Sequence, residues 1–267
     1  MIMDLRIIKD ILPHSGVCGY EDIACSLLPC RAVSRLPQGA KSVIVSIFPY
    51  YLGKAAYSGL NISKYAAVPD YHTVVAARLE RACAALQSEY PDEKFAAFTD
   101  NSPLPEVYAA YLAGLGVIGK NGLLITPDFG SYVFIGEIVT TLALKASSPA
   151  EGGCSACGKC TARCPAGALN GGFYKEKCLS AITQKKSTLT SEEERLIRLN
   201  ACAWGCDECQ NACPMNAHAA VTDIEEFIAG ARPCVNAGDS VQGRAYAWRG
   251  KDIIERNLAL LQTDGKE

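Results

Sequence analysis

The residues with the clearest potential for chemistry in this chain of 267 residues are its 14 cysteines. Four of them follow the spacing C-x2-C-x2-C-x3-C, and a proline comes directly after the last. They are Cys154, Cys157, Cys160 and Cys164, followed by Pro165. Bacterial ferredoxins bind [4Fe–4S] clusters with this run, in which three thiolates hold one cluster and the fourth binds a second cluster. The spacing therefore predicts a protein that transfers single electrons.

A second run repeats the pattern from its second position onwards, with Cys206, Cys209, Cys213 and then Pro214. Ala203 stands where the first cysteine of this run is expected, so the eighth ligand must come from elsewhere. We expect one cluster on Cys154, Cys157, Cys160 and Cys213, and the other on Cys164, Cys206, Cys209 and either Cys178 or Cys202. Two structural zinc sites are the alternative, but zinc ligands typically occur in separated C-x2-C pairs.

Composition and charge exclude several classes of protein. The 26 lysines and arginines nearly balance 28 aspartates and glutamates, which argues against a strong electrostatic grip on nucleic acid. No apolar run approaches the roughly 18 residues of a membrane span. Residues 1–15 lack the small-residue cleavage site of a signal peptide. We therefore expect a cytoplasmic protein whose cysteines serve metal or redox chemistry rather than disulfides.

Cysteine density divides the chain into two expected domains. Residues 146–153 (ASSPAEGG) are small, polar and rich in glycine and proline, which is typical of a linker. We place an α/β (α+β) domain at residues 1–148 and a ferredoxin-like double [4Fe–4S] domain with helical connectors at residues 149–267. Because about 150 residues precede the clusters, the first domain is expected to bind a cofactor or substrate.

Hydrophobic patterns predict the elements of the first domain. Residues 42–48 (SVIVSIF) are β-branched and predict a buried strand. Asp70 can cap a helix whose apolar residues recur at helical spacing up to Leu86. A second helix is expected at residues 105–115, and segments 123–126 and 131–140 are expected to pair as a β-hairpin.

The second domain contains helix-start signals. Thr190 and Glu193 form a capping-box pattern. Thr222 and Glu225 predict another helix start. Apolar residues within 254–261 predict an amphipathic helix.

Short motifs between about residues 30 and 216 resemble the epoxyqueuosine reductase family. Its members are cobalamin- and iron–sulfur-dependent enzymes that reduce epoxyqueuosine to queuosine in tRNA. The motifs occur in the family's order. They are residues 36–45 (LPQGAKSVIV), 65–72 (YAAVPDYH), 100–106 (DNSPLPE), 113–121 (AGLGVIGKN), 130–137 (GSYVFIGE) and 205–210 (GCDECQ), together with both cysteine runs.

The resemblance implies roles for individual residues. Asp100 would donate a proton to the departing oxygen, and Cys178 would be the eighth cluster ligand in preference to Cys202. The first domain would bind cobalamin and substrate, and the clusters would supply the electrons. The implied cobalamin contacts are Ser63, Tyr65, Asp100, Leu124, Ile135, Ser180 and Asp207.

The resemblance also implies partners. Longer members carry a C-terminal helical-repeat extension that helps to grip tRNA, and the match here is to a short form without it. We expect tRNA or a queuosine-type nucleoside as substrate, an external electron donor such as a flavodoxin or ferredoxin, no membrane partner, and a monomer. Two alternatives are a two-cluster electron-transfer protein without corrinoid and a corrinoid reductase that acts on a different substrate.

Several residues also have simpler interpretations. Asp100 could cap the following helix, and as an acid it would have to keep its proton through burial. His72 is expected to be a structural histidine rather than a cobalt ligand. Four lysines near the iron–sulfur ligands indicate either a solvated face or an RNA-phosphate contact. They are Lys175, Lys177, Lys185 and Lys186.

Overall fold

The computed structural model describes residues 5–262, and these residues form two compact units. The N-terminal unit comprises the chain up to Pro49 together with Tyr71–Ser155, and the C-terminal unit comprises Tyr50–Asp70 and the chain from Ala156 onwards. The sequence predicts a division after residue 148, with all of residues 50–70 in the first domain. Backbone hydrogen bonds explain why this segment joins the C-terminal unit: Ser63 N donates to Trp204 O over 2.7 Å, and Ala203 N donates to Asn61 O over 2.7 Å.

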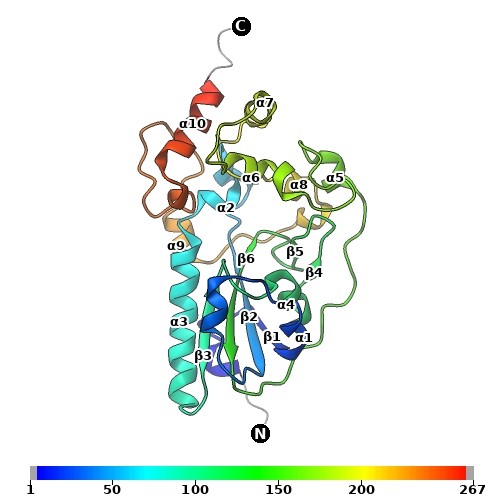
Figure 1. Cartoon of the computed structure of the whole chain (residues 1–267), viewed down its shortest axis with the longest axis vertical. Coiled ribbons are helices and arrows are strands. Elements are labelled where there is room, and N and C mark those ends of the chain that lie inside the picture. Colours follow the sequence, from blue (N-terminus) through cyan, green and yellow to red (C-terminus); the bar gives the residue numbers. More distant parts are fainter. Residues whose placement is uncertain (1–4, 263–267) are drawn as a thin grey trace. The chain divides into compact units, whose positions relative to one another are not determined.

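The N-terminal unit is built on a four-stranded antiparallel sheet in the order β1-β2-β6-β3 (Figure 1). The strands are β1 (Ser15–Gly19), β2 (Ser42–Pro49), β6 (Val133–Thr140) and β3 (Phe95–Thr99). Every residue of β2 is buried, as its run of apolar residues predicts. The long central strand β6 lies between β2 and β3, so its side chains reach the middle of both faces of the sheet.

The predicted hairpin of residues 123–126 and 131–140 is wrong in its pairing. The turn is present, because Thr126 N donates to Gly130 O over 2.8 Å. However, β5 (Leu124–Ile125) pairs with β4 (Val117–Ile118), whereas β6 pairs with β2 and β3. Both edges of β6 are thus occupied by strands that lie far away in the sequence.

Helices cover both faces of the sheet. Helix α3 (Tyr71–Glu89) packs on β3 and β6, and a Cβ at Gly136 would lie 2.8 Å from Val75 and 2.9 Å from Leu79 of this helix. Side chains alternate along a strand, so Ile135 and Glu137 point to the opposite face. Helix α4 (Glu106–Leu112) lies on that face, where its alanines share an apolar cluster with Ile135. The other helical segments of this unit are α1 (Glu21–Ala24) and the 3-10 turns Leu5–Ile8 and Arg31–Arg35.

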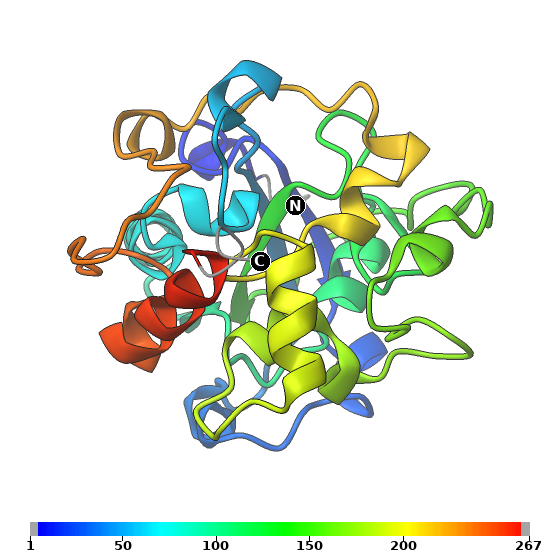
Figure 2. The ribbon, with the colours of Figure 1, turned by 90° about the horizontal axis from the view of Figure 1, so that it is seen from above.

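The C-terminal unit consists of short helices around a core that contains Trp204 and Tyr246, whose rings lie 5.8 Å apart. Helices α7 and α10 lie side by side in Figure 2 and pack on each other. The helices are α2 (Lys64–Ala67), α5 (Lys159–Arg163), α6 (Leu179–Thr183), α7 (Ser191–Leu199), α8 (Glu208–Asn211), α9 (Glu225–Ala229) and α10 (Lys251–Gln262). The 3-10 segments are Lys54–Tyr57, Lys175–Lys177, Pro214–Asn216 and Ala247–Arg249.

Local sequence signals predict some of the helices of this unit. Thr190 accepts a hydrogen bond from Glu193 N over 3.2 Å, and the Glu193 carboxylate accepts one from Thr190 N, which confirms the capping box. The predicted cap at Thr222 is wrong, because α9 begins after Ile224 and Thr222 accepts a hydrogen bond from Ile224 N. Within residues 5–262, no helix combines the length and the apolar character that crossing a membrane requires.

The close approach of α3 to β6 predicts a stability effect. Because a methyl group at position 136 would press on Val75 and Leu79, Gly136→Ala should lower the free energy of unfolding by about 1–3 kcal/mol. The measurement is urea unfolding followed by circular dichroism. Gly153→Ala is the matched control, because nothing lies within 4 Å of a Cβ there. An equal effect of both substitutions would contradict this packing.

Candidate functional site

Asp100 lies in a strained turn directly after β3. Both Asp100 and Asn101 have positive φ angles, of 47° and 37°. This left-handed region is rare for residues other than glycine and costs on the order of 1–3 kcal/mol each, although aspartate and asparagine tolerate it better than most. Asn101 N donates a 2.7 Å hydrogen bond to Asp100 Oδ1, which holds the turn in this shape.

The other oxygen of Asp100 accepts two hydrogen bonds from the first turn of α3. Tyr71 OH and His72 Nε2 each lie 2.9 Å from Asp100 Oδ2. The Tyr71 ring stacks on both the His72 ring and Phe134, with centroids 4.1 Å apart in each case. His72 therefore positions a carboxylate in this structure, which agrees with its expected structural role.

These contacts decide the charge of Asp100. The hydrogen bond from His72 is the largest cause that lowers the pKa of Asp100 to about 2, with further lowering by Asn101 N and Tyr71 OH and an opposing effect of burial. The expectation that burial keeps this carboxyl protonated is thus wrong, because Asp100 is ionised at neutral pH. It can donate a proton only after it has received one.

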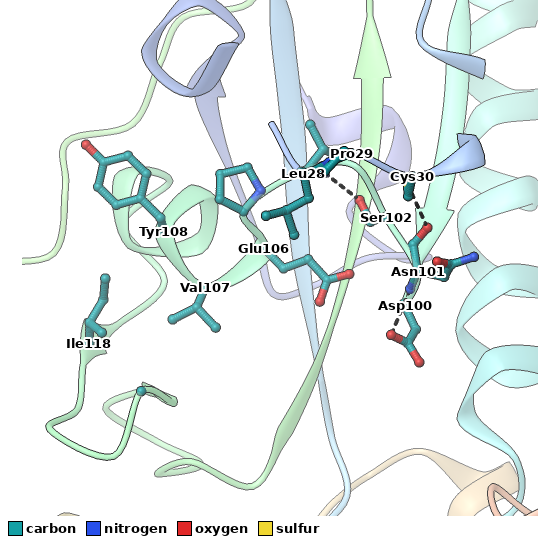
Figure 3. Close-up of a pocket in the computed structure, with 13 residues that line it drawn as sticks. Leu28, Pro29, Cys30, Asp100, Asn101, Ser102, Glu106, Val107, Tyr108 and Ile118 are labelled. Atoms are coloured by element: carbon teal, nitrogen blue, oxygen red, sulfur yellow. Dashed lines mark hydrogen bonds between the residues drawn. The ribbon is translucent and has the colours of Figure 1, made fainter. Parts of the chain in front are cut away.

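A pocket of about 630 Å³ opens beside Asp100 in the N-terminal unit (Figure 3). Its apolar wall includes Leu28, Val107 and Ile118, and Glu106 projects into the same space as Asp100. The pocket therefore combines an apolar lining with carboxyl groups, which is typical of a site for a small polar group.

A third carboxyl group lies beneath the loop that follows β3. Glu137 on β6 has no exposed surface, and its Oε2 accepts a 3.0 Å hydrogen bond from Ser102 Oγ. Burial raises the pKa of Glu137 well above its ordinary value. Burial and, to a smaller extent, the negative charge of the nearby Asp100 raise the pKa of Glu106 to about 7. Sequence reasoning assigned no role to either glutamate, although a glutamate within the apolar segment VFIGEIVT is a signal in itself.

One cysteine of each run lies on a helix of the C-terminal unit. Cys160 lies on α5 and Cys209 lies on α8, and these helices pack on each other. Arg163 Nε donates to Glu208 Oε2 over 2.7 Å and joins the same helices. This proximity is what an exchange of the last cysteine between the two runs requires. Within residues 5–262, no three His, Cys, Asp or Glu side chains are placed to hold one single ion.

The two candidates for the eighth ligand have different surroundings. Cys178 directly precedes α6, and its backbone N bonds to Lys175 O. The Cys202 thiol donates to Trp204 O over 3.3 Å and to Gly205 O over 3.4 Å, so it is engaged as a protonated group. The preference for Cys178 over Cys202, which the resemblance implies, stays a prediction.

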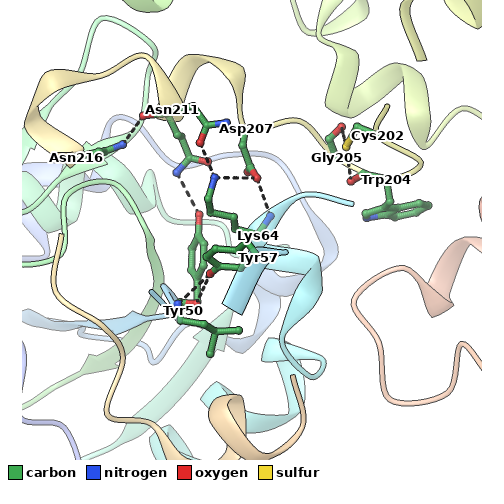
Figure 4. A network of polar contacts seen from close by, with 11 residues as sticks. Tyr50, Tyr57, Lys64, Cys202, Trp204, Gly205, Asp207, Asn211 and Asn216 are labelled. Carbon is green, nitrogen blue, oxygen red and sulfur yellow. Dashed lines mark hydrogen bonds and ion pairs between the residues drawn. The ribbon is translucent and has the colours of Figure 1, made fainter. Parts of the chain in front are cut away.

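A buried polar network in the C-terminal unit connects α2 and α8 (Figure 4). Lys64 donates to Asp207 Oδ2 through its backbone N over 2.8 Å and through Nζ over 3.5 Å, and Lys64 Nζ also contacts Asn211. Two buried atoms of this region, Ser63 Oγ and Asp207 Oδ1, have no hydrogen-bond partner among the described residues. A Cβ at Gly205 would collide with Ser63 Oγ, so the backbone approaches closely here. Buried polar atoms are normally satisfied, and such a pair fits a polar group supplied by a ligand.

The remaining predicted contacts are distributed over both units. Tyr65 OH accepts a 2.8 Å hydrogen bond from Trp204 Nε1 beside this network, and Ser180 lies on α6. Leu124 and Ile135 lie on β5 and β6 of the N-terminal unit. Their roles in cofactor binding stay predictions. Of the four lysines near the second run, Lys185 forms an ion pair with Glu193 at 2.8 Å.

Comparison with known proteins adds independent findings. The family described as "Epoxyqueuosine reductase QueG, DUF1730" matches residues 31–101, and the family described as "4Fe-4S double cluster binding domain" matches residues 153–216. The epoxyqueuosine reductase of Synechocystis sp. is 34% identical over 219 residues, which cover 78% of this chain and 75% of that protein. The enzyme of Listeria monocytogenes is 33% identical over 72% of this chain and 54% of its own length.

The fold is also similar to a solved structure. A crystal structure of epoxyqueuosine reductase with an epoxyqueuosine-modified tRNA-Tyr stem loop matches with a TM-score of 0.79 and 23% identity, over 95% of this chain and 78% of that one. This likeness supports the mixed α/β architecture. The chain spans about half the length of several curated relatives that it matches.

The hydrogen bonds to Asp100 predict its titration. His72→Gln should raise the pKa of Asp100 from about 2 towards 3.8, because it changes the largest stabilising contact of the carboxylate. Tyr71→Phe should raise it by less. Carboxyl ¹³C NMR of the labelled protein measures both values. An Asp100 midpoint near neutral pH in the unmodified protein would contradict the charge assigned here.

The ligand choice predicts the iron content of two variants. Cys178→Ala should lose the iron of about one cluster after anaerobic reconstitution, because it removes one of the eight thiolates. Cys202→Ala is the matched control and should keep the full iron content. Iron and sulfide assays on both variants make the comparison, and loss of iron from Cys202→Ala alone would reverse the assignment.

Proposed function

Since the chain belongs to the epoxyqueuosine reductase family, we propose that it reduces epoxyqueuosine to queuosine in tRNA. The single observation that carries the proposal is the 34% identity with a family member over 75% of that protein's length. The double-cluster domain at residues 153–216 provides iron–sulfur clusters for electron transfer. The N-terminal unit contributes the pocket with Asp100.

The proposed reaction sets clear requirements for electrons and protons. Removal of the oxygen of an epoxide to leave a carbon–carbon double bond consumes two electrons and two protons, and releases one water molecule. Iron–sulfur clusters pass electrons one at a time, so two clusters can hold the pair. Two protons must also reach the oxygen that leaves.

Asp100 is the residue that we assign to proton transfer at the oxygen. It lies in the pocket of the N-terminal unit, and His72 and Tyr71 fix its orientation. Its carboxylate is ionised before the reaction, so it acts as a relay that takes up a proton and passes it on. Leu28, Val107 and Ile118 form the apolar part of the pocket wall.

Cobalamin is the second cofactor in this proposal. The unpartnered buried atoms Ser63 Oγ and Asp207 Oδ1 fit a ligand that brings its own hydrogen-bonding groups. Ser63, Tyr65, Ser180 and Asp207 of the C-terminal unit would hold it. When bound, a corrinoid supplies a low-valent cobalt centre that can deliver electrons to carbon.

The proposed substrate is tRNA rather than a free nucleoside. Support comes from the similar enzyme whose structure contains an epoxyqueuosine-modified tRNA stem loop. Three lysines beside the second cluster run, Lys175, Lys177 and Lys186, are candidates for phosphate contacts, whereas Lys185 is already paired with Glu193. A flavodoxin or ferredoxin is the proposed electron donor.

Cofactor loading is the first test of this function. We expect anaerobic reconstitution with iron, sulfide and hydroxocobalamin, followed by desalting, to leave about eight irons per chain, as two [4Fe–4S] clusters contain, together with one cobalt. Ser63→Ala should lower cobalt retention without loss of iron, because it removes a polar group from the proposed cofactor site. Ser58→Ala, an exposed serine of the same segment, is the control. Full iron without any retained cobalt would support an electron carrier instead.

Conversion of the substrate is the second test. The loaded protein with a chemical reductant should convert epoxyqueuosine in an anticodon stem loop into queuosine, detected by mass spectrometry as the loss of one oxygen atom. Asp100→Asn should keep both cofactors and lower the rate by about 100-fold or more, as the loss of an acid–base group does. Retained cobalt without conversion of either the stem loop or the free nucleoside would indicate a corrinoid reductase with another substrate.

A further inference from the structure

Glu137 occupies an unusual position for a carboxyl group. It lies in the middle of β6, paired with Val45 of β2 and Phe98 of β3, and has no exposed surface. Its only described hydrogen bond is the one that Ser102 Oγ donates to Oε2, and its Oε1 is buried without a partner. An ionised carboxylate in such surroundings would be very costly, so this group is held in its neutral form.

Glu106 lies between this buried group and the pocket. It is the first residue of α4, it lines the pocket together with Asp100, and its Oε1 is likewise buried without a partner among the described residues. The carboxyl groups of Glu106 and Glu137 lie close enough to influence each other electrostatically. Two neighbouring buried carboxyls cannot both ionise at low cost, and at least one proton therefore stays on the pair.

The groups that face Glu106 set the pH range in which its proton exchanges. Burial and, to a smaller extent, the negative Asp100 raise the pKa of Glu106 to about 7, and His72 on α3 opposes this increase. Burial also keeps Glu137 on β6 neutral and raises the pKa of the Cys18 thiol on β1 to about 12. Glu106 is thus the member of this group whose charge changes near neutral pH.

We propose that Glu106 is a proton store for the Asp100 pocket, with Glu137 beneath it as the neutral group that keeps the store loaded. This assignment rests on the proposed function, because that reaction consumes two protons while Asp100 itself holds none at neutral pH. Glu106 stands beside Asp100 in the pocket and acts through it, so it is a positioning and proton-supplying residue.

The proton balance of the step closes with the groups named. The epoxide oxygen has two carbon–oxygen bonds, and both must break. When the first breaks, its electron pair stays on the oxygen, and Asp100 passes to that oxygen the proton that it has received from the Glu106 carboxyl. Glu106 becomes a carboxylate and takes up another proton from solvent through the pocket opening. When the second carbon–oxygen bond breaks, a second proton transfer along the same path completes the water molecule, and the two electrons that the clusters supply balance the carbon–carbon double bond that forms.

Infrared spectroscopy tests the proton store without any need for turnover. The reconstituted protein should show a C=O band of protonated carboxyl groups. One part of its intensity should be lost between pH 6 and pH 9 with a midpoint near 7, and the other part should persist above pH 9. Glu106→Gln should remove the titrating part, and Glu137→Gln should remove the persistent part. Glu89→Gln, an exposed glutamate on α3, is the control and should change neither. A titrating band that survives in Glu106→Gln would overturn the proposal.

The pH profile of the reaction is the second readout. In the unmodified protein, the rate of stem-loop conversion should fall above pH 7 as Glu106 loses its proton. Glu106→Gln should lower the rate at pH 6 at least tenfold and remove the decrease of the rate above pH 7, while the iron and cobalt contents stay unchanged. Glu106→Asp should have a rate between those of Glu106→Gln and the unmodified protein. Conversion with an unchanged pH profile in Glu106→Gln would overturn the inference alone. Absence of conversion by the unmodified protein would instead reject the proposed function, and the infrared titration would still decide the protonation of Glu106.

Discussion

The arrangement of the pocket depends on one buried carboxyl group in the centre of the sheet. Glu137 needs a hydrogen-bond donor where the surrounding side chains are apolar, and the loop after β3 provides it through Ser102. Ser102 Oγ in turn accepts a hydrogen bond from Leu104 N, which fixes the path of the chain into α4. The strained backbone of Asp100 and Asn101 lies at the start of this loop, so the stability of the sheet and the geometry of the pocket are coupled.

The same pocket holds carboxyl groups in opposite protonation states. Asp100 receives three hydrogen bonds, from Tyr71, His72 and Asn101, and this lowers its pKa. Glu106 is surrounded by apolar atoms and a negative neighbour, and this raises its pKa. Carboxyl groups whose surroundings separate their pKa values can divide the roles of acid and base between them. In the C-terminal unit, Cys160 and Cys209, one from each cysteine run, lie on helices that pack together, as a pair of electron-carrying clusters requires.

Features that depend on short sequence distances could be predicted. The spacing of Cys154 to Cys164 predicted the cluster domain, and the family match at residues 153–216 confirms it. The capping box of Thr190 and Glu193 needs only three residues and was also confirmed. The strand at residues 42–48 could be predicted because it is buried along its whole length, and its sequence is therefore a continuous run of mostly apolar residues.

Features that depend on distant partners could not be predicted. The hairpin failed because β6 pairs with β2 and β3, which lie at sequence distances that no local pattern encodes. The membership of residues 50–70 in the C-terminal unit follows from hydrogen bonds to residues near 204. Likewise, the charge of Asp100 depends on His72, 28 positions earlier in the chain, so its motif alone gave the wrong protonation state.

The central claim is that electrons from the clusters of this chain reduce an epoxide on RNA. The most direct test is a single-turnover measurement with the cobalamin-loaded, fully reduced protein and no further reductant. After mixing with an epoxyqueuosine-containing stem loop, we expect one queuosine to form for every two electrons that the protein's cofactors lose. The absorbance of the cofactors measures this loss of electrons. The contradicting result is that the reduced clusters pass electrons to an added oxidised ferredoxin, whereas no queuosine forms from the stem loop.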